Sequence, residues 1–100
     1  MTKITELNQA LGYFFSATQL QILEVLDDAG GPMTQREIED ELRKRFKVPA
    51  KRATILENLN KLKNYGYIIL DIADAQPYSG RRPNQFRLDN DRVREDLVHE

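Results

Sequence analysis

The stretch that decides the fold is residues 50–72, AKRATILENLNKLKNYGYIILDI, where the spacing of the apolar residues changes from that of a helix to that of a strand. Apolar residues in its first part gather on one side of a helix from about residue 50 to residue 64: Ile55, Leu56, Leu59 and Leu62. Gly66 stands where such a helix ends. Residues 67–72 are mostly β-branched or aromatic and alternate as in a strand. The sequence therefore predicts a helix that leads through a glycine into a strand.

Two helices are predicted near the N-terminus. The first has apolar residues at spacings of three and four, namely Ile4, Leu7, Leu11 and Phe14. The second begins at Ser16, because Gln19 completes a capping box with it, and it ends at Gly30-Gly31-Pro32. Apolar residues cover more than half of its circumference, which is typical of a helix at the centre of a core.

A third predicted helix is joined to the helix at 50–64 by a tight break. Thr34 and Glu37 form its capping box, and its buried stripe is Ile38, Leu42 and Phe46. It ends at Lys47-Val48-Pro49, since the residue before a proline avoids helical geometry. So short a connection is typical of a helix-turn-helix, whose second helix enters the major groove of DNA. A plain helical hairpin is the alternative.

A hairpin and a short helix complete the predicted fold. Residues 75–83 have turn chemistry, and residues 84–88 form the returning strand with Phe86 and Leu88 toward the core. A last helix is capped by Asp89, Asn90 or Asp91 and carries Val93, Leu97 and Val98. The fold class is α+β, mainly helical: a winged helix-turn-helix with a two-stranded β-hairpin wing. We expect one domain over residues 1–100, with an N-terminal helix at 1–15, the winged-helix core at 16–88 and a short tail at 89–100.

Composition excludes several classes of protein. The chain has no cysteine and one histidine, His99, next to its last residue, so disulfides, thiolate zinc sites and cysteine nucleophiles are excluded. No catalytic triad, metal-ligand spacing or phosphate-binding glycine loop is present. No apolar run approaches the roughly 20 residues that span a bilayer, and no signal peptide begins the chain. We therefore expect a cytoplasmic protein that is not an enzyme. We also expect it to bind no metal and no cofactor and not to associate with a membrane.

Charge is segregated along the chain, although the net charge is only −1. Residues 1–42 have two basic and eight acidic side chains, residues 43–63 have eight basic and one acidic, and residues 64–100 have five basic and seven acidic. Such a separation creates a local positive field that the net charge of the whole chain does not reveal. Part of it has a structural explanation, since Arg43, Lys44 and Arg45 are favourable charges at the C-terminus of a helix.

The outer face of the helix at 50–64 predicts a surface that recognises DNA bases. Thr54 and Lys61 lie opposite its buried side, with Asn58 beside them, and small and amide side chains approach bases closely. Glu57 lies there too; it either accepts from a cytosine amino group or stays outside the contact. Cations for phosphates stand at the start of the helix and in the turn before it: Lys47, Lys51 and Arg52.

The hairpin tip supplies a second predicted contact. Its cationic, hydrogen-bonding residues suit the minor groove or the phosphates beside it: Tyr78, Ser79, Arg81 and Arg82. The alternative is that Arg81 and Arg82 only solubilise the tip.

The pattern Leu59-x-x-Leu62-x-x-x-Gly66-x-Ile68, with a strand, an arginine-containing turn and Phe86-Arg87-Leu88 after it, resembles the core of MarR- and PadR-type regulators. Residues 16–26 are similar to their first core helix, and residues 34–42 to the helix before the recognition helix. The resemblance implies DNA contacts from Lys51, Arg52, Thr54, Asn58, Lys61, Arg81 and Arg82. Arg81-Arg82-Pro83 departs from the Asp-x-Arg of MarR wings.

The predicted function is sequence-specific binding of double-stranded DNA by a homodimeric transcriptional repressor on an inverted-repeat operator. Apolar residues of the N-terminal segment either face the second subunit or pack in the core: Leu7, Leu11, Phe14 and Phe15. The alternative function is a winged-helix module that binds protein in a larger assembly, since residues 1–42 are acidic. No residue pattern indicates a small-molecule effector.

Overall fold

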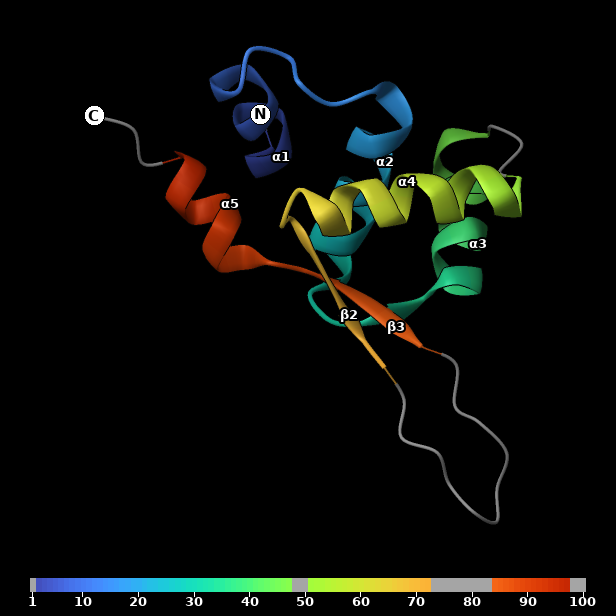
Figure 1. Cartoon of the computed structure of the whole chain (residues 1–100). Coiled ribbons are helices and arrows are strands. Elements are labelled where there is room, and N and C mark those ends of the chain that lie inside the picture. Colours follow the sequence, from blue (N-terminus) through green and yellow to red (C-terminus); the bar gives the residue numbers. More distant parts are fainter. Residues whose placement is uncertain (1, 48–50, 73–83, 98–100) are drawn as a thin grey trace.

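The computed structural model describes residues 2–47, 51–72 and 84–97. Within these ranges the chain forms five helices and three strands (Figure 1). In chain order they are α1 (Lys3–Ala10), α2 (Ala17–Ala29), β1 (Met33–Thr34), α3 (Gln35–Phe46), α4 (Arg52–Asn64), β2 (Ile68–Asp71), β3 (Gln85–Leu88) and α5 (Asn90–Leu97).

The ends of α2 and α3 are fixed by the side chains that the sequence predicts. The Ser16 hydroxyl accepts from the Gln19 N–H at 3.2 Å, and the Gln19 side chain accepts from the Ser16 N–H at 3.1 Å. Thr34 and Glu37 form the same reciprocal pair at the start of α3. Each box satisfies backbone N–H groups that have no partner inside the helix. Both predicted capping boxes are therefore confirmed.

The first predicted helix is wrong in its length. α1 ends at Ala10, and the chain then turns through Gly12 and Tyr13, whose φ angles are +72° and +62°. The Asn8 side chain accepts from the Phe15 N–H at 3.1 Å and stabilises this turn. As a consequence Phe14 lies outside the helix and is 51% exposed.

The sheet is antiparallel, with its three strands in the order β1-β3-β2. The predicted hairpin is confirmed by β2 and β3, which pair Ile68 with Leu88 and Leu70 with Phe86. The third strand, β1, was not expected from the sequence; it pairs with the other edge of β3. Phe86 and Leu88 are buried, as predicted. The predicted fold class is thus confirmed, with one short strand added.

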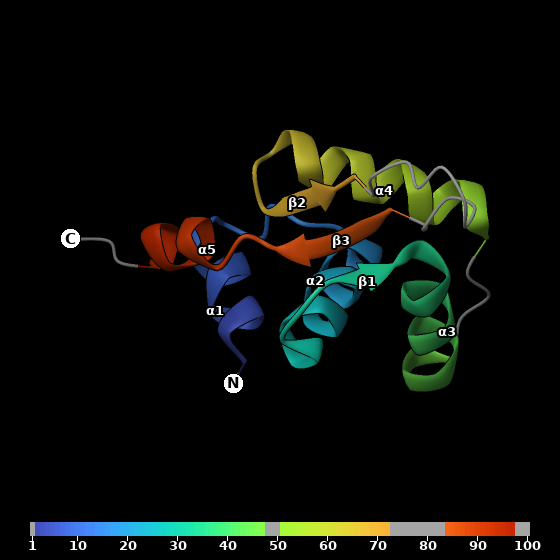
Figure 2. The ribbon, with the colours of Figure 1, turned by 90° about the horizontal axis from the view of Figure 1, so that it is seen from below.

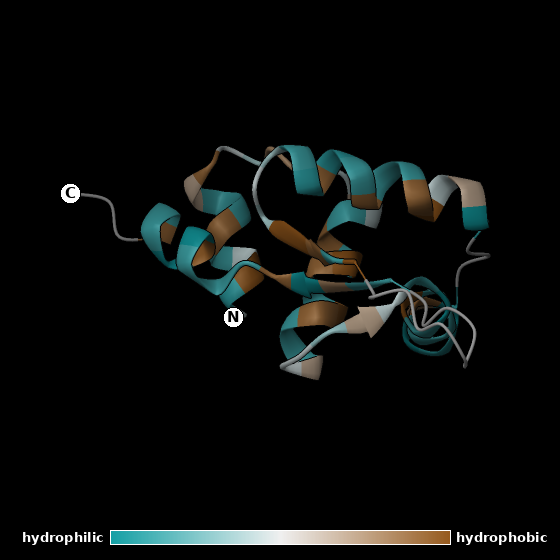
Figure 3. Cartoon of the chain, turned by 60° about the horizontal axis from the view of Figure 1, so that its bottom comes forward, coloured by the Kyte–Doolittle hydropathy of each residue, from teal (hydrophilic) through white to brown (hydrophobic). Residues whose placement is uncertain are grey.

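The core lies between α2, α4 and the sheet. α2 contributes the largest share of its fully buried side chains: Ile22, Leu23, Val25 and Leu26. Figure 3 shows hydrophobic stretches of ribbon on α2 and within the sheet, and hydrophilic ribbon along most of α5. α1 and α5 lie together at one end of the molecule and α3 at the other (Figures 1 and 2). α4 therefore runs across the sheet with its first turn near α3.

The N-terminal segment divides between the core and the surface. Leu7 and Phe15 are buried in the core, so core packing accounts for both of them. Leu11 is half-buried, and Phe14 and Tyr13 are exposed.

At the other end of the chain, the Asp89 side chain accepts from the Arg92 N–H at 3.1 Å, so Asp89 is the predicted cap that the structure uses. Val98 lies outside the described residues.

No helix in the described ranges has both the length and the apolar character needed to cross a bilayer.

Candidate nucleic-acid interface

The connection between α3 and α4 is short. Lys47 ends α3 in a left-handed conformation, with φ +55°, and its N–H donates to the Arg43 carbonyl at 3.1 Å. Residues 48–50 are outside the described residues, and Lys51 precedes α4 in an extended conformation. α4 thus begins at Arg52, two residues later than the predicted start at Ala50. Lys47 and Lys51 are both exposed at this connection.

α4 buries a narrow stripe and exposes most of the rest of its surface. Ile55, Leu59 and Leu62 are buried, whereas Leu56, which the sequence places on the buried side, is 42% exposed. Leu56 follows Arg52 by four residues, so both lie on the flank of α4 that faces the sheet. Thr54 and Lys61 are exposed on the outer face, as expected for residues available to a ligand.

Asn58 differs from its neighbours because its amide is occupied within the protein. Its side chain is half-buried, its Oδ1 accepts from Gln19 Nε2 at 3.3 Å, and its Nδ2 donates to the Thr54 carbonyl at 3.0 Å. The amide keeps a second N–H and a second oxygen lone pair, so a contact between Asn58 and a base does not require these two hydrogen bonds to break. The predicted contact stays a prediction.

Several cations of the basic segment are paired with acids. The Arg43 guanidinium pairs with Asp40, and that of Arg45 with Asp28. These pairs agree with a structural role for both arginines at the end of α3. Lys61 Nζ lies 3.3 Å from Glu57 Oε1, one helical turn earlier. Glu57 therefore has a cationic neighbour on an exposed surface, where such a pair contributes little to stability.

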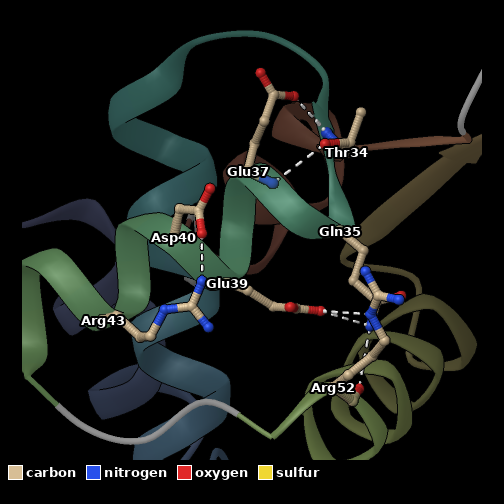
Figure 4. A network of polar contacts seen from close by, with 7 residues as sticks. All are labelled: Thr34, Gln35, Glu37, Glu39, Asp40, Arg43 and Arg52. Atoms are coloured by element: carbon tan, nitrogen blue, oxygen red, sulfur yellow. Dashed lines mark hydrogen bonds and ion pairs between the residues drawn. The ribbon is translucent and has the colours of Figure 1, made fainter.

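Arg52 takes part in a polar network that joins α3 to α4 (Figure 4). Its Nε lies 3.5 Å from Glu39 Oε2, and the Gln35 side chain donates to the Arg52 carbonyl at 3.1 Å. The Arg52 side chain is 72% exposed, and that of Glu39 is 8% exposed. A buried acid from α3 thus faces the first residue of the predicted recognition helix.

A groove of about 520 Å³ opens between α4, the start of α3 and the sheet. Donors, acceptors and apolar side chains line it together: Thr34, Gln35, Arg36, Arg52, Leu56, Asn60, Leu70, Asn84 and Phe86. Of these residues the sequence analysis predicted only Arg52 as a contact. The spacing of Arg52, Leu56 and Asn60, four residues apart, is the signal that identifies one groove-facing flank.

Both strands of the wing lie within the described residues, whereas the tip that joins them lies outside those residues. β2 and β3 are held together at this end by an ion pair, in which Arg87 Nε lies 3.1 Å from Asp71 Oδ2. Ile72, which follows β2 and is the last described residue before the tip, is 74% exposed. The predicted tip contacts Tyr78, Ser79, Arg81 and Arg82 lie outside the described residues.

Within residues 2–47, 51–72 and 84–97, no group of His, Cys, Asp and Glu side chains has the geometry of a metal site.

A helix-turn-helix followed by a paired hairpin defines the winged-helix class of folds. No family model matches this sequence, and no curated protein matches it either. Among solved structures, the fold is similar to that of Bacillus subtilis PadR in complex with operator DNA, with a TM-score of 0.61 and 18% sequence identity. The match covers 85% of this chain and 49% of the PadR chain, so this chain spans about half the length of that protein. The predicted likeness to PadR is thus supported at the level of the fold.

Proposed function

We propose that this chain is a winged-helix transcriptional regulator of the PadR type that binds double-stranded DNA in a sequence-dependent manner. One observation carries the proposal. Two exposed cations stand at the start of α4, Lys51 just before the helix and Arg52 as its first residue, and α4 borders a groove against α3 and the sheet. The fold neighbour PadR, whose solved structure contains operator DNA, supports a DNA ligand for this arrangement.

In this proposal α4 lies in the major groove of DNA. Lys47 and Lys51 neutralise phosphates beside the start of α4, and Thr54 and Lys61 contact the duplex from its outer face. Arg52 is one of the residues that line the groove against the sheet. The wing tip contacts the minor groove or its phosphates through Tyr78, Ser79, Arg81 and Arg82.

The proposed regulator acts as a homodimer. One winged-helix module covers few base pairs, so two half-sites about one helical turn apart supply the affinity of a specific complex. Tyr13 and Phe14 are exposed aromatic side chains of the N-terminal segment and are the proposed contacts with the second subunit. Binding to an inverted repeat that overlaps a promoter would repress transcription by excluding the polymerase, in the cytoplasm.

A gel-shift experiment tests the wing and α4 separately. The probes are duplexes selected from a random pool with the wild-type protein, together with one unselected duplex. Arg81→Ala with Arg82→Ala should weaken binding to all probes by a similar factor, because phosphate contacts carry no sequence information. Asn58→Ala should narrow the difference between selected and unselected probes, because Asn58 is proposed to contact a base. Wild-type binding by the double wing variant would remove the wing from the proposed interface.

A further inference from the structure

The buried carboxylate of Glu39 is the least expected polar group of the interface. Glu39 is 6% exposed, and burial of an unpaired carboxylate is costly. Its side chain points from α3 toward the start of α4 (Figure 4). Its position therefore requires partners, and α4 supplies one of them.

Three side chains form a closed set at this point. Gln35 Nε2 donates to Glu39 Oε2 at 3.0 Å and to the Arg52 carbonyl at 3.1 Å. Glu39 Oε2 also lies 3.5 Å from Arg52 Nε. Gln35 thus ties the backbone at the start of α4 to α3, and Glu39 faces the guanidinium. Gln35 therefore bonds the backbone of Arg52, and Glu39 forms an ion pair with its side chain, both from α3.

The guanidinium keeps its outer edge available. Its Nε faces Glu39, and within the described part of the chain no partner is found for its Nη1 and Nη2 groups. Two parallel N–H donors at the end of an arginine match the O6 and N7 acceptors of guanine in the major groove. The Arg52 side chain as a whole is 72% exposed, so the guanidinium is accessible to a ligand.

The charge of the pair argues against a phosphate as the partner of Arg52. The carboxylate of Glu39 offsets the positive charge of the guanidinium, which reduces its attraction for a phosphate at long range. Base recognition depends instead on the orientation of donors, and a fixed side chain loses less conformational entropy on binding. Lys51, exposed next to it, is a better cation for a phosphate.

We propose that Arg52 is a specificity-determining residue that recognises a guanine base, and that Glu39 and Gln35 are positioning residues that fix its orientation. This inference rests on the proposed DNA-binding function and names one of the bases that the site recognises. It changes the predicted role of Arg52 from a cation for phosphates to a base contact.

The test compares guanine recognition in the wild type and in Glu39→Gln. Duplexes are selected from a random pool by the wild type, and the selected guanine is then replaced by 7-deazaguanine, which lacks the N7 acceptor. We expect the replacement to weaken wild-type binding by about tenfold, within the range for loss of a bidentate contact. In Glu39→Gln the same replacement should have a smaller effect, about twofold, because the guanidinium is no longer fixed.

Two further variants separate positioning from folding and from charge. Glu41→Gln makes the same chemical change on α3, two residues away and thus on another side of the helix, and it should keep the wild-type response. Arg52→Met keeps a long unbranched side chain at an exposed position but removes every hydrogen-bond donor together with the charge. It should lose the response to 7-deazaguanine, and its salt dependence should stay close to that of the wild type, because Arg52 is not proposed to contact a phosphate.

The outcomes distinguish this inference from the proposed function. If the wild type binds no duplex, the proposed function fails and the inference fails with it. If the wild type binds with a guanine preference and either Glu39→Gln or Arg52→Met keeps the full 7-deazaguanine response, the inference is wrong and the proposed function stands. The inference is also wrong, and the proposed function also stands, if Glu39→Gln weakens binding to all duplexes by one common factor.

Discussion

Gly66 joins α4 to the wing in a backbone conformation that other residues adopt at a cost. Its φ angle is +89°, and a Cβ atom built on it would lie 2.7 Å from Nη1 of Arg92. The end of the arginine side chain can move aside, so the strain of the left-handed backbone dominates. We expect Gly66→Ala to lower the free energy of unfolding by about 1–2 kcal/mol, as measured by urea denaturation.

Gly31 provides the matched control for this prediction. Its φ angle is outside the left-handed range, and a Cβ atom there would meet nothing within 4 Å. Gly31→Ala should therefore change stability little or raise it by roughly 0.4–1 kcal/mol, through a smaller entropy of the unfolded chain. Equal losses in the two variants would contradict the role assigned to the conformation of Gly66.

Tyr67 makes the stability of the fold depend on pH. Burial, followed by the hydrogen bond to the Asp96 carboxylate, raises the pKa of the Tyr67 phenol above its ordinary value, although the guanidinium of Arg92 opposes the shift. A raised pKa in the folded state means that the neutral phenol stabilises the fold. This contribution is complete below the pKa of an unfolded tyrosine, about 10, and is lost as the pH rises through the folded pKa.

Ultraviolet titration of the tyrosines checks this expectation. The Tyr67 phenol should ionise above the ordinary pKa of a tyrosine, about 10, and Tyr67→Phe should remove that late transition. The stability of Tyr67→Phe should also depend less on pH above 10 or so than that of the wild type. A late transition that survives in Tyr67→Phe would assign the shift to another tyrosine.

At the scale of single elements, the start of α3 depends on its cap. The Thr34 hydroxyl accepts from the Glu37 N–H at 3.1 Å, and Glu37 Oε1 accepts from the Thr34 N–H at 2.8 Å. Thr34→Ala should cost about 1 kcal/mol of stability. Thr54→Ala, at an exposed position inside α4, is the control and should have a smaller effect in thermal melts. A loss no larger than that of the control would contradict the importance of the cap.

The elements differ in how far the sequence predicts them. Ser16 and Thr34 fix helix starts through residues three positions away, so local sequence is sufficient. β1 has only two residues and owes its conformation to pairing with β3, more than 50 residues later in the chain, so no local period reveals it. The end of α1 depends on Asn8, whose carbonyl and side chain both bond the turn, and helical periodicity alone extends past that point.

The candidate site shows the same division between local and tertiary information. Exposure of Thr54 and Lys61 follows from helical spacing and was predicted correctly. The engagement of Asn58 by Gln19, and of Arg52 by Glu39, depends on how α4 crosses α2 and α3. Those contacts join residues that are 39 and 13 positions apart, and nothing in the sequence around either residue encodes them.

At the scale of the whole molecule, one core supports both the helix-turn-helix and the wing. Leu59 is fully buried on the inner side of α4, so its side chain belongs to the core that α2 and the sheet complete. Leu59→Ala should lower the free energy of unfolding by about 2–5 kcal/mol, from lost transfer energy and the cavity left behind. Leu56→Ala, at a 42% exposed position on the same helix, should cost much less. Similar losses would contradict the orientation of α4.

The central claim is that the exposed side of α4 and the wing form a surface for duplex DNA. The most direct measurement is the affinity for a labelled duplex, by fluorescence anisotropy, over a series of salt concentrations. If the claim holds, the logarithm of the affinity falls linearly with the logarithm of the salt concentration, with a slope near −0.9 per phosphate contacted. Lys51→Ala should make that slope shallower by about 1.

Absence of binding to any duplex at low salt, or an affinity that does not change with salt, would contradict the claim and favour a module that binds protein.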